Sequence, residues 1–166
     1  SFYSCETVEM ELLASPNALS SDQADPDLLL NSIQLSYRGS QRTFSNNSGD
    51  LGRISYMGGR QYLDNYGDGT LNGAWNSFYS NNQPNLLALE QISEANPDRD
   101  LSYHLGVAKT LQAHTLMQLV DYLGDIPWSE ANNSAEFPKP SVDDDASVYD
   151  AAIAYLSEAA GHFASG

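Results

Sequence analysis

The chain has 166 residues, of which 22 are Asp or Glu and 7 are Lys or Arg, so its formal net charge is −15. Such an acidic surface repels the phosphates of nucleic acids and anionic lipid headgroups, so we do not expect nucleic acid as a partner. No apolar run approaches the roughly 20 residues that a membrane-spanning helix needs. The acidity suits an uncharged ligand, a cation, or an exported setting in which charge keeps the protein soluble.

Residues 1–24 carry turn-forming residues and predict a tether ahead of a folded domain at residues 25–166. A single cysteine, Cys5, excludes an internal disulfide. The small residue Ser4 directly before it is typical of a lipoprotein processing site, although the apolar segment of such a signal is absent. Two interpretations stay open: Cys5 is lipidated, or it is an incidental free or buried thiol.

The first helix is expected to begin at Pro26, because proline fits the first helical position and the Asp25 side chain can cap the helix. Apolar residues then recur at four-residue spacing as far as Tyr37. This pattern leaves two predicted ends for the helix, Gly39 and Phe44.

The next segment, residues 45–70, is rich in glycine. It predicts a short helix from Leu51 to Met57, followed by an aromatic-bearing loop. Aromatic faces stack on the C–H faces of sugars, while Asp and Asn side chains can hydrogen-bond to pairs of hydroxyls. The candidate ligand-binding residues here are Tyr62, Asp64, Asn65, Tyr66 and Trp75. For Trp75 a core position is the alternative, because it stands at helical spacing with other aromatic residues.

Another helix is expected from Leu71, and Pro84 either kinks it or starts the helix that continues to Ala95. Residues 96–98 predict a turn. The clearest helix spans Asp100 to Leu123, where apolar residues at steps of three and four form one continuous face.

Gly124 is expected to end this helix in a left-handed conformation, with Asp125 bonded to backbone amides and Pro127 setting the exit direction. The last helix begins at Asp145 or Ser147. Its apolar residues are expected to point inward: Val148, Tyr149, Ala152, Ile153, Leu156, Ala159 and Phe163. No segment shows persuasive strand alternation, so the sequence predicts an all-α fold of antiparallel helix pairs.

Two motifs carry a family resemblance. The stretch AKTLQAHTLMQLVDYLGDIPWSE (Ala108 to Glu130) resembles the signature helix of SusD/RagB outer-membrane nutrient-binding lipoproteins, which ends in Gly-Asp-Val/Ile-Pro. SVYDAAIAYLSEA (Ser147 to Ala159) resembles the helix that follows it. Gln112 and Tyr155 depart from the family, which has arginine and aspartate there. The glycine-rich, aromatic N-terminal region is more similar to the second, divergent SusD-like subfamily.

The resemblance implies a tetratricopeptide-like (TPR-like) helical scaffold, of which this chain is the N-terminal portion. It also implies a lipoprotein tethered through Cys5 to the extracellular face of the outer membrane. Such a protein captures oligosaccharide, or sometimes peptide, and passes it to a SusC-type TonB-dependent transporter. The resemblance further implies that the chain is not an enzyme and uses no cofactor.

Two other functions stay open: a TPR-like adaptor that contacts a protein through its acidic face, and a helical glycan-processing enzyme. Catalytic signals are weak, because His104 and His114 lie ten residues apart and therefore on different sides of one helix. The sequence has no His-Glu-x-x-His motif, nucleophile elbow or phosphate-binding loop.

A metal site is not expected either. The stretch Asp64–Gly69 begins like a calcium loop, but Tyr66 and Trp75 occupy its third and twelfth positions, where an EF-hand needs oxygen ligands. The acidic run at residues 143–145 could hold calcium, but it fits better a solvated helix start, where negative charge favours the helix dipole.

Overall fold

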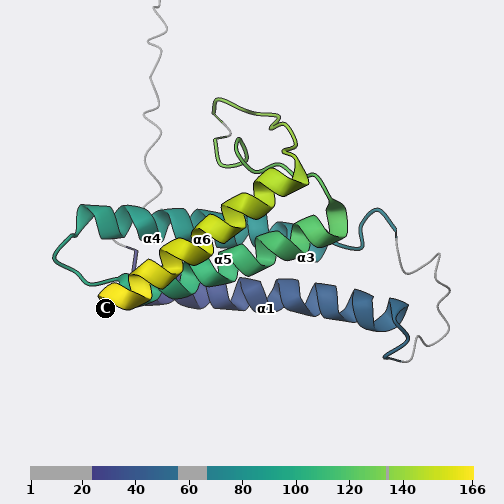
Figure 1. The fold of residues 1–166 in the computed structure, drawn as a ribbon, viewed down its shortest axis with the longest axis horizontal. Coiled ribbons are helices and arrows are strands. Elements are labelled where there is room, and N and C mark those ends of the chain that lie inside the picture. Colours follow the sequence, from purple (N-terminus) through teal and green to yellow (C-terminus); the bar gives the residue numbers. More distant parts are fainter. Residues whose placement is uncertain (1–23, 56–66, 134) are drawn as a thin grey trace, which may run out of the picture.

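The computed structural model describes residues 24–55, 67–133 and 135–166. These residues are helical apart from their connections and one isolated β-bridge between Ile126 and Asp143, which confirms the all-α prediction. The elements in chain order are α1 (Pro26–Leu51), α3 (Asn72–Ser77), the π-helical turn η1 (Phe78–Asn82), α4 (Gln83–Ala95), α5 (Ser102–Leu123) and α6 (Asp145–Ser165) (Figure 1).

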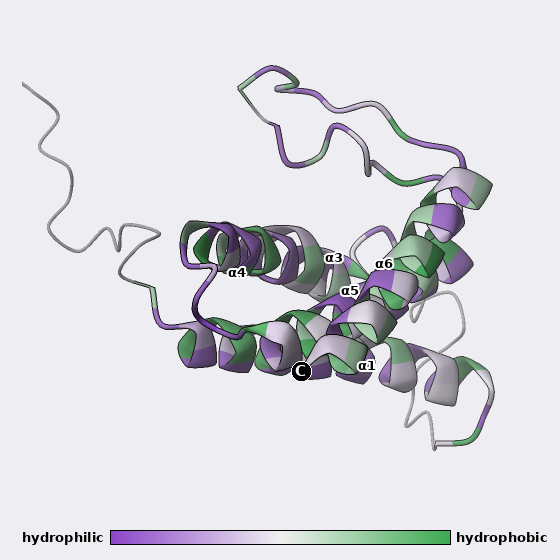
Figure 2. Ribbon diagram, turned by 60° about the vertical axis from the view of Figure 1, so that its left-hand side comes forward, coloured by the Kyte–Doolittle hydropathy of each residue, from purple (hydrophilic) through white to green (hydrophobic). Residues whose placement is uncertain are grey.

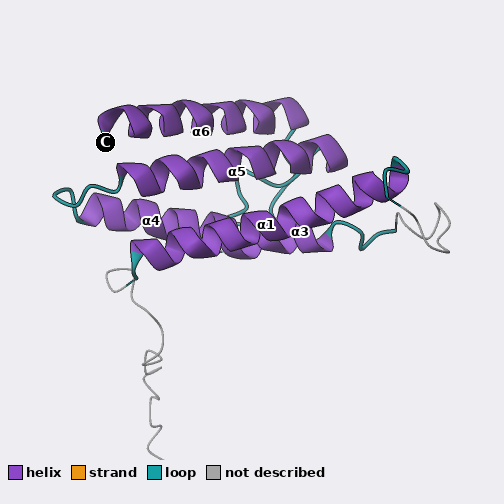
Figure 3. Cartoon of the chain, turned by 90° about the horizontal axis from the view of Figure 1, so that it is seen from below, coloured by secondary structure: helices purple, strands orange, loops and turns teal. Residues whose placement is uncertain are grey.

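Helix α5 lies at the centre of the arrangement. It contacts α1, α4 and η1 on one side, while α6 packs antiparallel to it on the other (Figure 3). In Figure 2 the outward side of α1 is largely hydrophilic, and hydrophobic residues lie where the helices face one another. None of the described helices combines the length and the apolar composition that crossing a bilayer requires.

Helix α1 begins as predicted but runs past both predicted ends. The Asp25 side chain accepts a hydrogen bond from the Asp27 amide at 3.0 Å, which caps the helix. The helix continues through Gly39 because Phe44, only 2% exposed, packs into the core beyond it. The short helix predicted from Leu51 is wrong in its described part, since residues 52–55 form turns and bends and residues 56 and 57 lie outside the described residues.

Pro84 was predicted either to kink a helix or to start a new one, and its surroundings have features of both arrangements. It is the second residue of α4, yet α3, η1 and α4 form one continuous helical run. Just before the proline, the Gln83 amide bonds to the Phe78 carbonyl five residues back, as in a π-helix. Because proline has no amide hydrogen, this widened turn lets the chain pass it without losing the helix. The helix ends at Ala95, as predicted.

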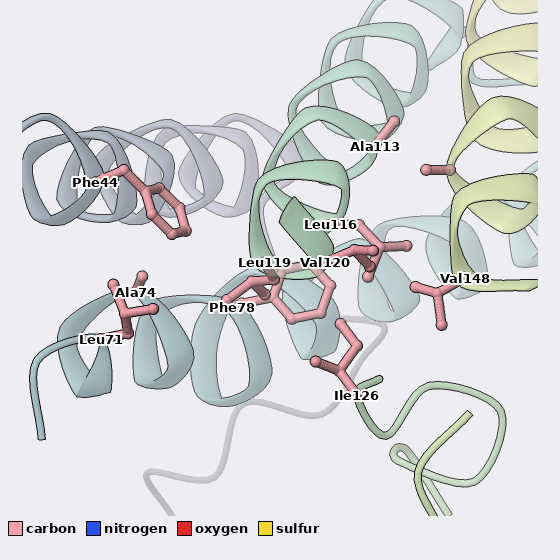
Figure 4. Packing of buried hydrophobic residues seen from close by; sticks show 11 residues of the cluster. Phe44, Leu71, Ala74, Phe78, Ala113, Leu116, Leu119, Val120, Ile126 and Val148 are labelled. Carbon is pink, nitrogen blue, oxygen red and sulfur yellow. The ribbon is translucent and has the colours of Figure 1, made fainter. Parts of the chain in front are cut away.

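The core consists of two clusters along α5. The first, shown in Figure 4, gathers around Phe78 and joins α1, η1, the second half of α5 and α6. Its fully buried members include Leu116, Leu119 and Val148. The second cluster joins Ile33 of α1 and the apolar face of α4 to the first half of α5.

The exit from α5 follows the prediction. Gly124 has φ 74° and ψ −127°, and its amide donates to the Val120 carbonyl at 2.8 Å. The chain then turns back so that Ile126, only 1% exposed, enters the first cluster. A positive φ of this kind is available mainly to glycine, which accounts for Gly124 at this position.

The inward side of α6 was predicted only in part. Val148, Ala152 and Ala159 are buried against α5, but Ile153 and Leu156 are 54% and 38% exposed. The apolar stripe of α6 is wider than its contact with α5, so these side chains remain in solvent. Phe163 is also 49% exposed, although its ring lies directly over Gly106 of α5.

We predict that Gly124→Ala lowers the free energy of unfolding by about 1–3 kcal/mol, because an alanine is strained at this φ. Gly161→Ala, at an exposed position inside α6 with open space around it, is the matched control and gains roughly 0.5–1 kcal/mol from helix propensity. Urea unfolding followed by circular dichroism measures both. Equal effects of the two substitutions would contradict the role of Gly124.

Candidate functional site

The structure places one of the five predicted ligand-binding residues. Trp75, in α3, is half-buried and packs against the first core cluster, with its ring centroid 4.4 Å from that of Tyr79. This packing favours the core interpretation of Trp75. The other four residues, Tyr62, Asp64, Asn65 and Tyr66, lie outside the described residues, as does Cys5.

A cavity of about 290 Å³ lies beside the segment that follows the predicted loop. It is formed by the residues leading into α3 and by the end of α5: Gly67, Asp68, Thr70, Leu71, Tyr122 and Leu123. The cavity therefore adjoins, along the chain, the stretch in which the sequence concentrates tyrosine, aspartate and asparagine.

A second cavity, of about 310 Å³, lies between α4 and α6 over the middle of α5. We refer to it as the Lys109 cleft. Its lining includes two carboxylates, an ammonium group, two aromatic rings and a small residue, namely Glu90, Glu158, Lys109, Trp128, Tyr155 and Ala154.

Lys109 is only 6% exposed and is held by carboxylates from both neighbouring helices. Its Nζ donates to Glu90 Oε1 on α4, and to Glu158 Oε2 on α6 at 2.6 Å. Burial alone would lower the pKa of this lysine, but the hydrogen bonds and charge attraction of Glu158 and Glu90 outweigh it and raise the pKa above its ordinary value. Lys109 is therefore an ammonium ion at neutral pH, and the triad carries one net negative charge.

Two aromatic rings form another part of the cleft. The rings of Trp128 and Tyr155 meet edge to face, with centroids 5.8 Å apart and an interplanar angle of 81°. The Lys109 ammonium lies 5.1 Å from the Tyr155 ring centroid, within the range of a cation–π contact. Burial, and then the charge of Glu90, raise the pKa of Tyr155, so its hydroxyl keeps its proton.

Asp143 fixes the backbone that carries Trp128. Its carboxylate accepts hydrogen bonds from the Trp128 amide at 2.8 Å, the Ser129 amide at 3.1 Å and the Ser129 hydroxyl at 2.6 Å. Burial opposes the charge, but these hydrogen bonds outweigh it and lower the pKa of Asp143 below its ordinary value. Nearby, the Tyr79 hydroxyl donates to the Pro127 carbonyl at 2.6 Å, which holds the preceding residue.

An acidic group at the start of α6 has a structural explanation. Oxygens of Asp125, Asp144 and Asp145 lie within 4.8 Å of one another, and all three residues are exposed. Asp125 Oδ1 accepts a hydrogen bond from the Asp145 amide at 3.1 Å, as predicted for its role at the helix exit. Negative charge is favourable at the N-terminus of a helix, so the arrangement suits the predicted helix start.

The two histidines of α5 contact α1 at separate places. His104 Nε2 lies 2.7 Å from Asp27 Oδ1, and His114 Nδ1 lies 3.0 Å from the Tyr37 hydroxyl. Each histidine therefore helps to fasten α5 to α1.

The Lys109 cleft was not predicted from the sequence. The available signal was a lysine on an inward-facing position of α5, since Lys109 stands four residues after Leu105 and seven before Leu116, both buried. A charged residue among buried apolar residues must have partners. The partners come from residues 19 and 49 positions away, which periodicity does not reveal.

We predict that Asp143→Asn makes folding less dependent on pH in the acid range. Because the native pKa of Asp143 is lowered, its carboxylate stabilises the fold above the unfolded pKa, and this contribution disappears as pH falls through the native pKa. The stability gap between the parent chain and the variant should therefore be largest near pH 7 and shrink as the pH falls below the ordinary pKa of an aspartate. Urea unfolding across this range measures the gap, with the exposed Asp150→Asn as control. A gap independent of pH would contradict the prediction.

The SusD-like_2 family model, described as "Starch-binding associating with outer membrane", matches residues 16–166. No curated protein and no solved structure was found to match the chain. The matched range contains every described helix and the candidate residues Tyr62 to Tyr66, and it confirms the resemblance found in the two C-terminal motifs. The chain belongs to the SusD-like_2 family.

Proposed function

We propose that this chain is a non-catalytic, glycan-binding part of a SusC/SusD-type nutrient uptake system on the cell surface. It binds oligosaccharide outside the outer membrane and delivers it to a TonB-dependent outer-membrane transporter. The observation that carries the proposal is the family match over residues 16–166, since the family's description joins starch binding to the outer membrane.

The helical arrangement supports a TPR-like scaffold as the frame of this binding protein. Helices α4 and α5, and then α5 and α6, form successive antiparallel pairs, as in stacked helical repeats. In this proposal residues 25–166 form the N-terminal part of a SusD-like helical domain. Residues 1–24 form the tether, and Cys5 carries the lipid that anchors it to the outer membrane.

The proposed glycan contacts are Tyr62, Asp64, Asn65 and Tyr66. Their chemistry supports the assignment, because aromatic rings stack on sugars while carboxylate and amide groups bind hydroxyls. The cavity lined by residues 67–71 and by the end of α5 also supports it, since it adjoins this stretch along the chain. Trp75 is assigned to the core instead.

Malto-oligosaccharide binding tests this function, because the family description names starch. We expect Tyr62→Ala combined with Tyr66→Ala to weaken binding of maltoheptaose by about tenfold or more, from the loss of two stacking contacts. Isothermal titration calorimetry on the full chain measures the affinity. The matched control is Tyr103→Ala, which removes a 65% exposed tyrosine from the start of α5.

Two results would overturn the proposal. One is a parent chain that binds no oligosaccharide from a broad panel. The other is turnover of an oligosaccharide that a single Asp or Glu substitution abolishes, which would establish the enzyme alternative.

A second candidate function is that of a TPR-like adaptor without glycan binding. The observation in its favour is the exposed apolar side of α6, where Ile153 and Leu156 lie in solvent next to one another on the helix. Exposed apolar patches of this kind commonly mark protein–protein contacts.

Capture of the transporter separates the two functions. The adaptor predicts that Ile153→Ser with Leu156→Ser abolishes co-purification of the TonB-dependent barrel, and that no saccharide binds. The control, Leu35→Ser, changes a residue on α1 that is 67% exposed. Undiminished capture together with saccharide binding would exclude the adaptor function.

A further inference from the structure

The Lys109 cleft has hydrogen-bonding capacity that its own residues leave unused. An ammonium group has three donors, and Lys109 directs two of them to Glu90 and Glu158. Each carboxylate uses one oxygen on the lysine. Within residues 24–55, 67–133 and 135–166, no hydrogen bond reaches the second oxygen of either carboxylate. The cleft therefore offers acceptors on both sides of a donor.

This pattern matches adjacent hydroxyl groups. A hydroxyl can donate to a carboxylate and accept from an ammonium ion, so neighbouring hydroxyls can bridge Glu90, Lys109 and Glu158 without displacing any of their contacts. A charged ligand fits less well. An anion meets two carboxylates, and a cation must compete for them with Lys109, which is buried and already bonded to both.

The size and the rings of the cleft restrict the ligand further. A volume of about 310 Å³ lies at the lower end of the range for small-molecule pockets, so it suits one ring rather than a long chain. Trp128 and Tyr155 supply aromatic surface beside the polar triad. A sugar ring has both of the required features, a C–H face and adjacent hydroxyls.

We propose that the Lys109 cleft is a second carbohydrate site, which holds a single pyranose ring against Tyr155 and Trp128 with adjacent hydroxyls on Glu90, Lys109 and Glu158. Lys109 stands 13 residues before Tyr122 on α5, and so roughly 20 Å from the cavity beside the predicted loop. The inference deepens the proposed function and rests on it for the choice of sugar, but it concerns a separate site.

The triad also has a structural use, since it connects α4, α5 and α6, and a test must leave it intact. Ala154 allows this, because it lines the cleft from an exposed position on α6. Ala154→Phe fills the cavity without changing Glu90, Lys109 or Glu158. The matched control is Ala160→Phe, which places the same ring at an exposed position on the same helix, outside the cleft lining.

The measurement is a titration with methyl α-D-glucopyranoside followed by NMR of the indole N–H groups. The chain has two tryptophans, so Trp128→Phe identifies the Trp128 signal. We expect this signal to shift and saturate in the parent chain and in Ala160→Phe. In Ala154→Phe the apparent affinity should fall by about tenfold or more, as expected when a ring no longer fits.

Three outcomes would overturn the cleft assignment. The first is binding of the glucoside by Ala154→Phe as tightly as by the parent chain. The second is a Trp128 signal that does not move on titration. The third is a shift of that signal by cyclohexylamine but not by the glucoside, which would make the cleft a cation site.

The maltoheptaose titration separates this inference from the proposed function. If Tyr62→Ala with Tyr66→Ala weakens maltoheptaose binding while Ala154→Phe leaves glucoside binding unchanged, the cleft assignment is wrong and the glycan-binding function stands. If the parent chain binds neither saccharide, both are wrong.

Discussion

The arrangement of the helices depends on one charged group that has almost no access to water. Lys109 sits in the middle of the most enclosed helix with only 6% of its surface exposed, and a buried ammonium ion without partners is costly by several kcal/mol. Glu90 and Glu158 offset that cost only while both are within hydrogen-bond reach. Helix α6 otherwise packs against α5. The two ion pairs of Lys109 therefore also set the position of α6 relative to α4. The hydrophobic clusters bring the helices together, and the triad restricts how α4 and α6 can slide along α5.

Local chemistry predicted where most elements begin and end. Asp25 with Pro26, Ala95 before a turn, and Gly124 each mark a boundary that the structure has, because caps and glycine conformations act within a few residues. Tertiary packing decided the rest. Helix α1 continues past Gly39 because burial of Phe44 outweighs the local tendency to stop. Three apolar residues of α6, Ile153, Leu156 and Phe163, remain exposed because one neighbouring helix cannot cover the whole stripe.

The candidate site was harder to predict than the fold. Residue chemistry pointed to the loop with Tyr62 and Tyr66, which lies outside the described residues, and to Trp75, which the structure places against the core. The Lys109 cleft combines α4, α5, α6 and the α5–α6 connection, so its members are scattered over nearly 70 positions of the sequence. Periodicity reports which face of a helix points inward. It does not report which inward positions from different helices meet.

The π-helical turn η1 has a consequence for how this chain tolerates changes in length. One extra residue in a helical turn rotates everything after it by about 100°. The turn thus sets the angle around the helix axis between two buried side chains. Phe78 points into the first core cluster and Leu89 into the second. If the same residues were wound as a regular α-helix, Leu89 would turn about 100° away from its position against α1 and α5. Removal of one residue from Phe78–Asn82 would instead restore a regular α-helix and leave the direction of Leu89 unchanged. An irregularity that looks dispensable is therefore the adjustment that lets one continuous helix serve two separate cores.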